Sequence, residues 1–245
     1  MSISSELLTL QNTKTAIRTA INNKGGSVGA SDTFASYATA IDNLPSGGGG
    51  NPLLKSIDVS DFTGTTFNDA ASYITDVTIP SGLTNITDSA FENCSRLSSI
   101  NIPNSVTVIG LSAFKNCTSL TSLHFPSSVT IIPYGVCSGC RSLTTVELPS
   151  NMTAFYNQTF EYCTSLASIT IPSTVTSIGT GSFYGCSGLT YIVCLPTTPP
   201  TLTNSNVFVN TNNCPIYVPA ASVDTYKAAN NWSTYADRIQ AIPSE

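Results

Sequence analysis

Residues 166–186 read Leu-Ala-Ser-Ile-Thr-Ile-Pro-Ser-Thr-Val-Thr-Ser-Ile-Gly-Thr-Gly-Ser-Phe-Tyr-Gly-Cys, and this pattern returns every 23 residues from residue 77 to residue 191. We number the five repeats as coils one to five, which begin at residues 77, 100, 123, 146 and 169. The cysteine column, for example, holds Cys94, Cys117, Cys140, Cys163 and Cys186. A period of this length without insertions predicts a solenoid, because one coil cannot bury its own apolar side and must stack on its neighbours.

The apolar spacing changes within one repeat, and the change predicts the path of the chain. Residues 169–171 alternate apolar, polar and apolar, as a half-buried strand does, and Pro172 should end that strand by withholding an N–H group. Residues 175–178 predict a second extended segment, after which Gly179 should permit a tight turn. The spacing of three over residues 183–189 predicts one turn of helix. Stacked coils would then place like residues about 4.8 Å apart.

This 23-residue unit resembles the BspA-type leucine-rich repeat. The resemblance implies an α+β solenoid that occupies residues 52–245, with an N-terminal cap at 52–76, five repeats at 77–191 and a C-terminal strand-helix cap at 192–245. Coils three and four depart from the pattern at Pro133, Cys137, Met152, Phe155 and Tyr156. These departures predict a surface of different shape on that part of the stack.

The C-terminal segment resembles the closing cap of BspA-like proteins. Residues 216–242 predict a last strand and a helix, with Pro219 at the start of the helix. Val223, Tyr226 and Trp232 are the apolar residues expected to cover the open end of the core.

The N-terminal residues 1–44 predict a separate helical module, joined to the repeats by a glycine-rich linker at 45–51. Apolar residues recur at steps of four and three, interrupted once at Lys14, in the seam Ile3, Leu7, Leu10, Ile17 and Ile21. Two interpretations remain open. The first helix pairs either with a second helix after Asp32, as a hairpin, or with copies of itself, in a homo-oligomer such as a trimer.

The stretches Lys24-Gly-Gly-Ser-Val and Asp32-Thr-Phe-Ala-Ser-Tyr-Ala-Thr-Ala-Ile resemble the leader module of bacteriophage tail and other virion proteins. This resemblance implies a virion component, a tail-fibre-like protein that binds a host receptor and other virion proteins. A bacterial cell-surface BspA-like adhesin and a virion decoration protein without a receptor are the alternatives. The expected partner is a host surface protein or glycan, and the expected location is the virion or the extracellular space.

Composition argues against two classes of partner. The chain has 9 Lys and Arg against 14 Asp and Glu, and no basic stripe that could follow a phosphate backbone, so we expect no nucleic-acid binding. No apolar stretch approaches the length of a membrane span, and residues 1–6 lack the basic region of a signal peptide, so we expect neither membrane insertion nor export by that route.

We interpret the eight cysteines mainly as buried free thiols and not as a redox site. Five occupy one inward column, where cysteine acts as a small apolar residue. Cys137 stands in the phenylalanine column, so the Cys137–Cys140 spacing follows from one substitution within the repeat. Cys194 and Cys214 lie outside the ladder, and whether they form a disulfide stays open.

Titratable groups suited to catalysis are scarce, and the chain is not expected to be an enzyme or to hold a metal or cofactor. His124 is the one histidine, and Glu147 one coil away is expected to pair with it across the surface. A tentative binding surface comprises His124 and the tyrosines Tyr134, Tyr156, Tyr162 and Tyr184. The alternative is that these tyrosines only pack over neighbouring coils.

Overall fold

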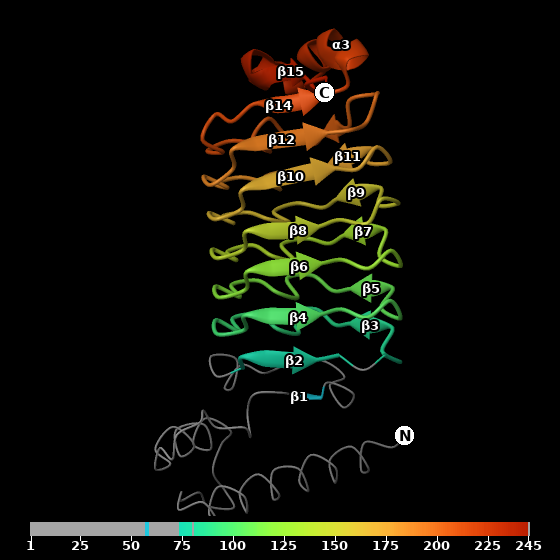
Figure 1. The fold of residues 1–245 in the computed structure, drawn as a ribbon, viewed down its shortest axis with the longest axis vertical. Helices are drawn as coiled ribbons and strands as arrows, with labels where there is room; N and C mark the ends of the chain where they lie inside the picture. The colour runs from blue at the N-terminus through green and yellow to red at the C-terminus, as the bar shows by residue number, and fades with distance from the viewer. Residues whose placement is uncertain (1–56, 59–73, 80, 245) are drawn as a thin grey trace, which may run out of the picture. The chain divides into compact units, whose positions relative to one another are not determined.

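The computed structural model describes residues 57–58, 74–79 and 81–244, all within one unit that spans Ile57–Glu245. One side of this unit is a row of parallel strands, called here the main strands (Figure 1). They are β1 (Ile57–Asp58), β2 (Asp76–Thr78), β4 (Ser99–Asn101), β6 (Ser122–His124), β8 (Thr145–Glu147), β10 (Ser168–Ile171), β12 (Tyr191–Cys194), β14 (Ile216–Val218) and β15 (Ile239–Ala241). Asp76 lies opposite Ser99, and Ser168 lies opposite Tyr191, so the 23-residue period is the register of the strands.

A second row of shorter parallel strands follows the main strands within each coil. It comprises β3 (Asn85–Ile86), β5 (Val108–Ile109), β7 (Ile131–Ile132), β9 (Ala154–Phe155), β11 (Ser177–Ile178) and β13 (Thr201–Leu202). The second residue of each strand is buried and the first faces outward. As predicted, β10 ends directly before Pro172.

The segment that leads back to the next main strand is a run of turns, so the predicted turn of helix is wrong. Two positions per repeat have positive φ: Ser89, Ser112, Gly135, Gln158 and Gly181 hold the first, and Asn93, Asn116, Gly139, Tyr162 and Gly185 the second. A right-handed helix cannot continue through left-handed residues. Hydrogen bonds instead alternate, within the coil from Cys94 N to Phe91 O at 3.1 Å and to the next coil from Asn93 N to Lys115 O at 2.8 Å. Because these turns also span three residues, their apolar spacing mimics a helix.

Gly179 serves close packing rather than the predicted tight turn, since its φ is not positive. A Cβ atom at Gly179 would lie 2.5 Å from the backbone nitrogen of Asn157 in the preceding coil. The Asn157 side chain accepts a hydrogen bond from Thr180 N at 2.9 Å, which holds the two coils together at this point. The glycine therefore leaves room for the preceding backbone and its asparagine.

The same coupling recurs between coils one and two. A Cβ atom at Gly110 would lie 2.3 Å from Asp88 N, and the Asp88 carboxylate accepts a hydrogen bond from Leu111 N at 2.7 Å. Where the preceding coil carries Leu111 or Tyr134 in place of an Asp or Asn, the following coil carries a bulky residue, Pro133 or Tyr156 respectively. Glycine in this column thus accompanies an acidic or amide side chain one coil earlier.

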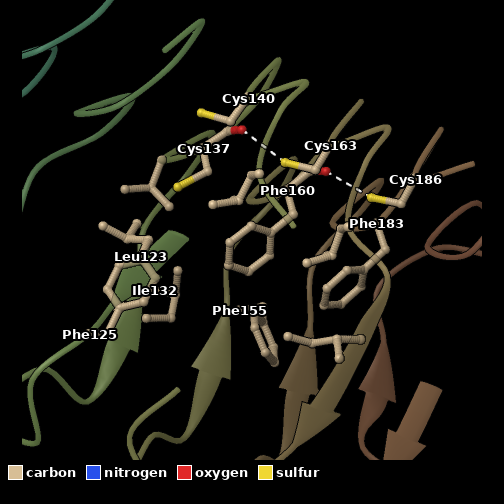
Figure 2. Packing of buried hydrophobic residues seen from close by; sticks show 14 of the residues in the cluster. Leu123, Phe125, Ile132, Cys137, Cys140, Phe155, Phe160, Cys163, Phe183 and Cys186 are labelled. Carbon is tan, nitrogen blue, oxygen red and sulfur yellow. Dashed lines mark hydrogen bonds between the residues drawn. The ribbon is translucent and has the colours of Figure 1, made fainter. Parts of the chain in front are cut away.

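The cysteine column is fully buried, as predicted, and each thiol after the first bonds to the coil before it. Cys117 Sγ donates to Phe91 O at 3.1 Å, and Cys186 Sγ donates to Phe160 O at 3.0 Å. Figure 2 shows this row of sulfur atoms beside the phenylalanine rings. Cysteine is favoured here because it fills a small apolar space and supplies a weak donor to a buried carbonyl.

The phenylalanine column is interrupted in coil three. Phe91 and Phe114 stack with ring centroids 5.5 Å apart, and Phe160 and Phe183 stack at 5.7 Å, whereas Cys137 occupies the position between these two pairs. Two other rings lie beside Phe160 instead (Figure 2): Phe125, which directly follows β6, at 6.5 Å and Phe155 of β9 at 6.3 Å between centroids. These rings supply volume near the place where the column lacks a ring.

Many surface hydroxyl groups bond to the backbone of the preceding coil. Thr144 Oγ1 donates to Thr121 O at 3.0 Å, Thr190 Oγ1 to Ala167 O at 2.9 Å, and Ser105 Oγ to Leu83 O at 2.7 Å. These side chains stabilise the stack, so their abundance says nothing about where the protein acts.

The C-terminal segment continues from β14 through the 3-10 helix η3 (Ala220–Ser222), α3 (Val223–Ala228) and the 3-10 helix η4 (Trp232–Arg238) into β15. Tyr226 and Trp232 are buried and Val223 packs against the core. Trp232 Nε1 donates to Pro200 O at 2.7 Å. The parallel pairing of β15 with β14 was not predicted from the sequence.

The helical module at 1–44, its seam Ile3–Ile21 and the linker at 45–51 lie outside the described residues. Of the predicted cap at 52–76, the structure describes residues 57–58 and 74–76, and Ile74 is buried in the core.

Candidate functional site

The outward side of the main strands carries the predicted His124–Glu147 pair. The two residues lie directly opposite each other on β6 and β8, and His124 Nδ1 is 2.8 Å from Glu147 Oε2. Their side chains are 61% and 69% exposed. Water screens such a pair, which is therefore worth little energy and fits an ordinary cross-strand contact.

A groove opens on the same side, between β8 and β10. Only one described backbone hydrogen bond joins these neighbouring coils along the groove, from Ala167 N to Thr144 O at 3.4 Å, whereas β6 pairs with β8 and β10 with β12 throughout. The groove has a volume of about 500 Å³. Its lining includes the hydroxyl residues Thr144, Thr145, Ser150, Ser168, Thr170 and Ser173, the apolar residues Val146, Leu148, Pro172 and Leu195, and Glu147.

Tyr134 and Tyr156 belong to an exposed apolar surface on coils two to four, which we call the second-strand patch. It consists of Val108, Leu111, Ile131, Tyr134 and Tyr156. Val108 and Ile131 hold the same outward position in successive second strands, and Leu111 and Tyr134 hold the same position in the turns after them. No ring contact joins Tyr134 to Tyr156 among the described residues.

Tyr162 and Tyr184 form a separate pair at the far end of the turn segment. Their ring centroids are 5.5 Å apart and the rings are perpendicular. Tyr162 has a φ of 57°, a left-handed conformation that is costly for an aromatic residue. A Cβ atom at Gly185 would lie 2.6 Å from the Tyr162 ring, so this glycine leaves space for the ring. The five predicted binding residues thus fall on three different parts of the coil.

One aromatic pair was not predicted from the sequence: Tyr191 on β12 and Tyr217 on β14. Both side chains face outward, and their ring centroids are 6.3 Å apart with an angle of 55°. Tyr191 lies in the column that holds Ser168 one coil earlier, so a tyrosine in a serine and threonine column was the available signal. Tyr217 was harder to place because it follows Val193, its partner in register, by 24 residues rather than 23.

All eight cysteines are buried and unpaired. Burial raises the pKa of Cys94 and of Cys186 to about 12, since a thiolate would lose its hydration there. Cys194 and Cys214 form no disulfide: Cys194 Sγ lies 3.3 Å from the Tyr226 hydroxyl, and Cys214 O accepts a hydrogen bond from Arg238 Nε at 2.8 Å. These contacts are those of structural residues.

Among the residues that the structure describes, no three His, Cys, Asp or Glu side chains gather as metal ligands would. None of the helices in this part of the chain has the length and apolar character required to cross a bilayer.

The fold is similar to that of the T. pallidum leucine-rich repeat protein TpLRR, which matches with 25% identity and a TM-score of 0.52, over 59% of this chain and 68% of that one. A leucine-rich cell surface protein from Faecalibacterium prausnitzii matches with 24% identity and a TM-score of 0.44, over 69% of this chain and 60% of that one. A leucine-rich repeat protein from Eubacterium ventriosum matches with 27% identity and a TM-score of 0.46, over 56% of this chain and 42% of that one. No protein with a curated description matches the chain.

The sequence itself matches a family description. Six copies of the BspA type leucine-rich repeat region cover residues 55–190 and 153–229, which together are more than half of the chain. The stacked parallel strands and the buried leucine and phenylalanine columns agree with that match. The chain therefore belongs to the BspA-type leucine-rich repeat family.

Proposed function

We propose that this chain is a non-catalytic adhesin of the bacterial cell surface, whose second-strand patch contacts a protein on another surface. One observation carries the proposal. Five of the eight large hydrophobic side chains that are exposed among the described residues belong to this patch. Apolar side chains gathered on an otherwise polar surface are typical of protein interfaces, where tyrosine is a common anchor.

Membership of the BspA-type family supports a bacterial surface protein over the virion component that the N-terminal resemblance implied. The virion interpretation depends on residues 1–44, which lie outside the described residues. The absence of catalysis is part of the proposal, and the open position of the His124–Glu147 pair supports it.

The experiment measures binding of labelled full-length protein to cultured epithelial cells and to bacterial cells by flow cytometry, before and after the cells are treated with protease. The double variant Tyr134→Ala, Tyr156→Ala should lower protease-sensitive binding at least about tenfold, because it removes both aromatic anchors. Its melting temperature should stay within a few degrees of the parent, since both side chains are exposed.

The matched control is Tyr162→Ala, Tyr184→Ala, which removes two tyrosines from the other end of the turn segment. It should leave binding unchanged. If the Tyr134, Tyr156 variant melts earlier while its binding is retained, these tyrosines are packing residues and the proposed interface is wrong.

A further inference from the structure

We propose that the main-strand side carries a second binding site, which takes a neutral oligosaccharide. The site combines the groove between β8 and β10 with the Tyr191–Tyr217 pair beside it. It lies on the main strands, whereas the second-strand patch lies on the second row of strands and the turns after them. The inference therefore goes beyond the protein contact proposed above.

The tyrosine pair lies next to the groove through the register of the sheet. Tyr191 is directly opposite Ser168, which lines the groove. Tyr217 is opposite Val193, and Val193 is opposite Thr170, another lining residue. Since strands pair about 4.8 Å apart, both rings stand within one or two strands of the groove on the same side of the sheet.

The stack does not require these rings, and their position suits contact with a sugar. Tyr191 is 42% exposed and occupies a column that carries aspartate in β2 and serine or threonine in β4 to β10, so the stack does not need a ring there. A tyrosine ring offers an apolar face to the C–H groups of a pyranose and a hydroxyl to its polar edge. Two neighbouring rings tilted by 55° provide a platform for adjacent sugar units.

The groove supplies hydrogen-bonding groups that the protein does not use. The hydroxyls of Thr145, Ser168, Thr170 and Ser173 make no hydrogen bond within the described part of the chain. By contrast, the hydroxyls of Thr144 and Thr190 are bound to carbonyl groups of the preceding coil. A row of unengaged hydroxyls next to apolar lining can both donate to and accept from sugar hydroxyls.

The charge of the groove restricts the class of glycan. Glu147 is its one charged lining residue, and a carboxylate accepts hydrogen bonds from sugar hydroxyls but repels carboxylates. Acidic glycans containing sialic or uronic acids would bring a negative charge to a site that offers no lysine or arginine among its lining residues. A volume of about 500 Å³ lies in the range of small-ligand sites.

The test is calorimetric titration of the full chain with cellotriose, chitotriose, mannotriose, lactose and sialyllactose. At least one neutral sugar should bind with a dissociation constant below about 10 mM, and sialyllactose should bind more weakly than lactose. Tyr191→Ala should lower the affinity at least about tenfold through the loss of stacking. Thr170→Arg, which fills the groove from an exposed position, should lower it as much or more.

Two controls separate binding from folding. Tyr134→Ala, at 43% exposure against 42% for Tyr191, should leave sugar affinity unchanged, and Tyr191→Phe should retain it. Circular dichroism melts should match the parent for all four variants. The proposal is overturned if no neutral sugar binds, if sialyllactose binds more tightly than lactose, or if either Tyr191→Ala or Thr170→Arg has no effect. None of these results touches the adhesin proposal, which depends on Tyr134 and Tyr156.

Discussion

Coils one and two, residues 77–122, and coils three and four, residues 123–168, fill the interior of the same stack in two different ways. The first pair is regular, with Phe91 stacked on Phe114. The second pair lacks the ring at Cys137 and has additional rings at Phe125, just after β6, and at Phe155 in β9. Where one column lacks a ring, neighbouring columns carry additional rings, so packing depends on the whole coil rather than on the residue in any one column.

The outer surfaces of the two regions differ as well. Coil two keeps Gly110 in the column where coils three and four carry Pro133 and Tyr156. The second-strand patch begins on coil two at Val108 and extends to Tyr156 in coil four. Aromatic residues of the patch thus occur in the coils that lack the glycine.

The largest expected effect is the loss of stability when a buried leucine of the same column is truncated in each region. Leu120→Ala in coil two and Leu143→Ala in coil three should each lower the free energy of unfolding by about 2 to 5 kcal/mol, because both leucines are fully buried and the cavity cannot collapse between stacked coils. Urea denaturation measures both. A much smaller loss at Leu143 would show that the irregular coils are loosely packed and that volume is not conserved.

The second prediction restores the missing ring. Cys137→Phe alone should lower the free energy of unfolding by about 1 to 3 kcal/mol through overpacking, because Phe125 and Phe155 already supply volume beside Phe160. Adding Phe125→Ile and Phe155→Ile to that variant should recover most of the loss. A Cys137→Phe protein that is as stable as the parent would mean that Phe125 and Phe155 do not compensate for the cysteine.

The third prediction concerns alkaline pH. It tests whether the thiols of the cysteine column are equally shielded from water in both regions. Burial raises the pKa of Cys94 in coil one to about 12 and also raises the pKa of Cys163 in coil four. The unfolded chain ionises these thiols near their ordinary value of 9.0 while the folded chain keeps them protonated, so their stabilisation is complete below pH 9 and is lost as pH rises toward the folded pKa. For each thiol, the free energy of unfolding should fall by about 1 kcal/mol per pH unit in that window.

Urea midpoints at pH 8 and pH 10 provide the measurement. Cys94→Ala and Cys163→Ala should each flatten the pH dependence, and Ellman's reagent should detect the eight thiols only after unfolding. Rapid labelling of folded protein would contradict the buried column.

The smallest expected effect is an increase in stability. Tyr162→Asn should raise the free energy of unfolding by up to about 1 kcal/mol, because asparagine tolerates the left-handed conformation that Asn93 and Asn116 adopt at the same position of the regular coils. Loss of the ring contact with Tyr184 offsets part of the gain. Thermal melts decide the sign. Tyr184→Asn, at a position without positive φ, is the control and should give no gain.

The sequence was sufficient for the parts of the fold that depend on repetition. The 23-residue register of the main strands and the burial of Leu120 and Cys117 follow from periodic apolar spacing. The end of β10 follows from Pro172, which has no N–H group to donate. The turn segment was misread because turns with hydrogen bonds across three residues give the same apolar spacing as one turn of helix. Only the left-handed residues distinguish such turns from a helical turn. They are hard to recognise in the sequence because some of these positions hold residues that are not typical of that conformation, such as Ser89 and Tyr162.

The candidate sites were less accessible from sequence, because they depend on contacts between columns. The groove exists where β8 and β10 separate, a feature that no single repeat reveals. Tyr191 and Tyr217 meet only through a register that changes from 23 to 24 residues after β12. Of the tyrosines predicted from sequence, Tyr134, Tyr156 and Tyr162 are exposed and Tyr184 is half-buried, and the four belong to two separate groups.

The pairing of Asp88 with Gly110, and of Asn157 with Gly179, has a consequence for how such a gene can lose or gain repeats. Removal of coil two would place Pro133 directly after the coil of Asp88, where even a Cβ atom at the Gly110 position lies 2.3 Å from Asp88 N. Removal of coil three would join Leu111 to Tyr156, a combination free of the Asp or Asn. A coil can therefore be lost or gained only where the two coils that become neighbours carry compatible residues at these two positions.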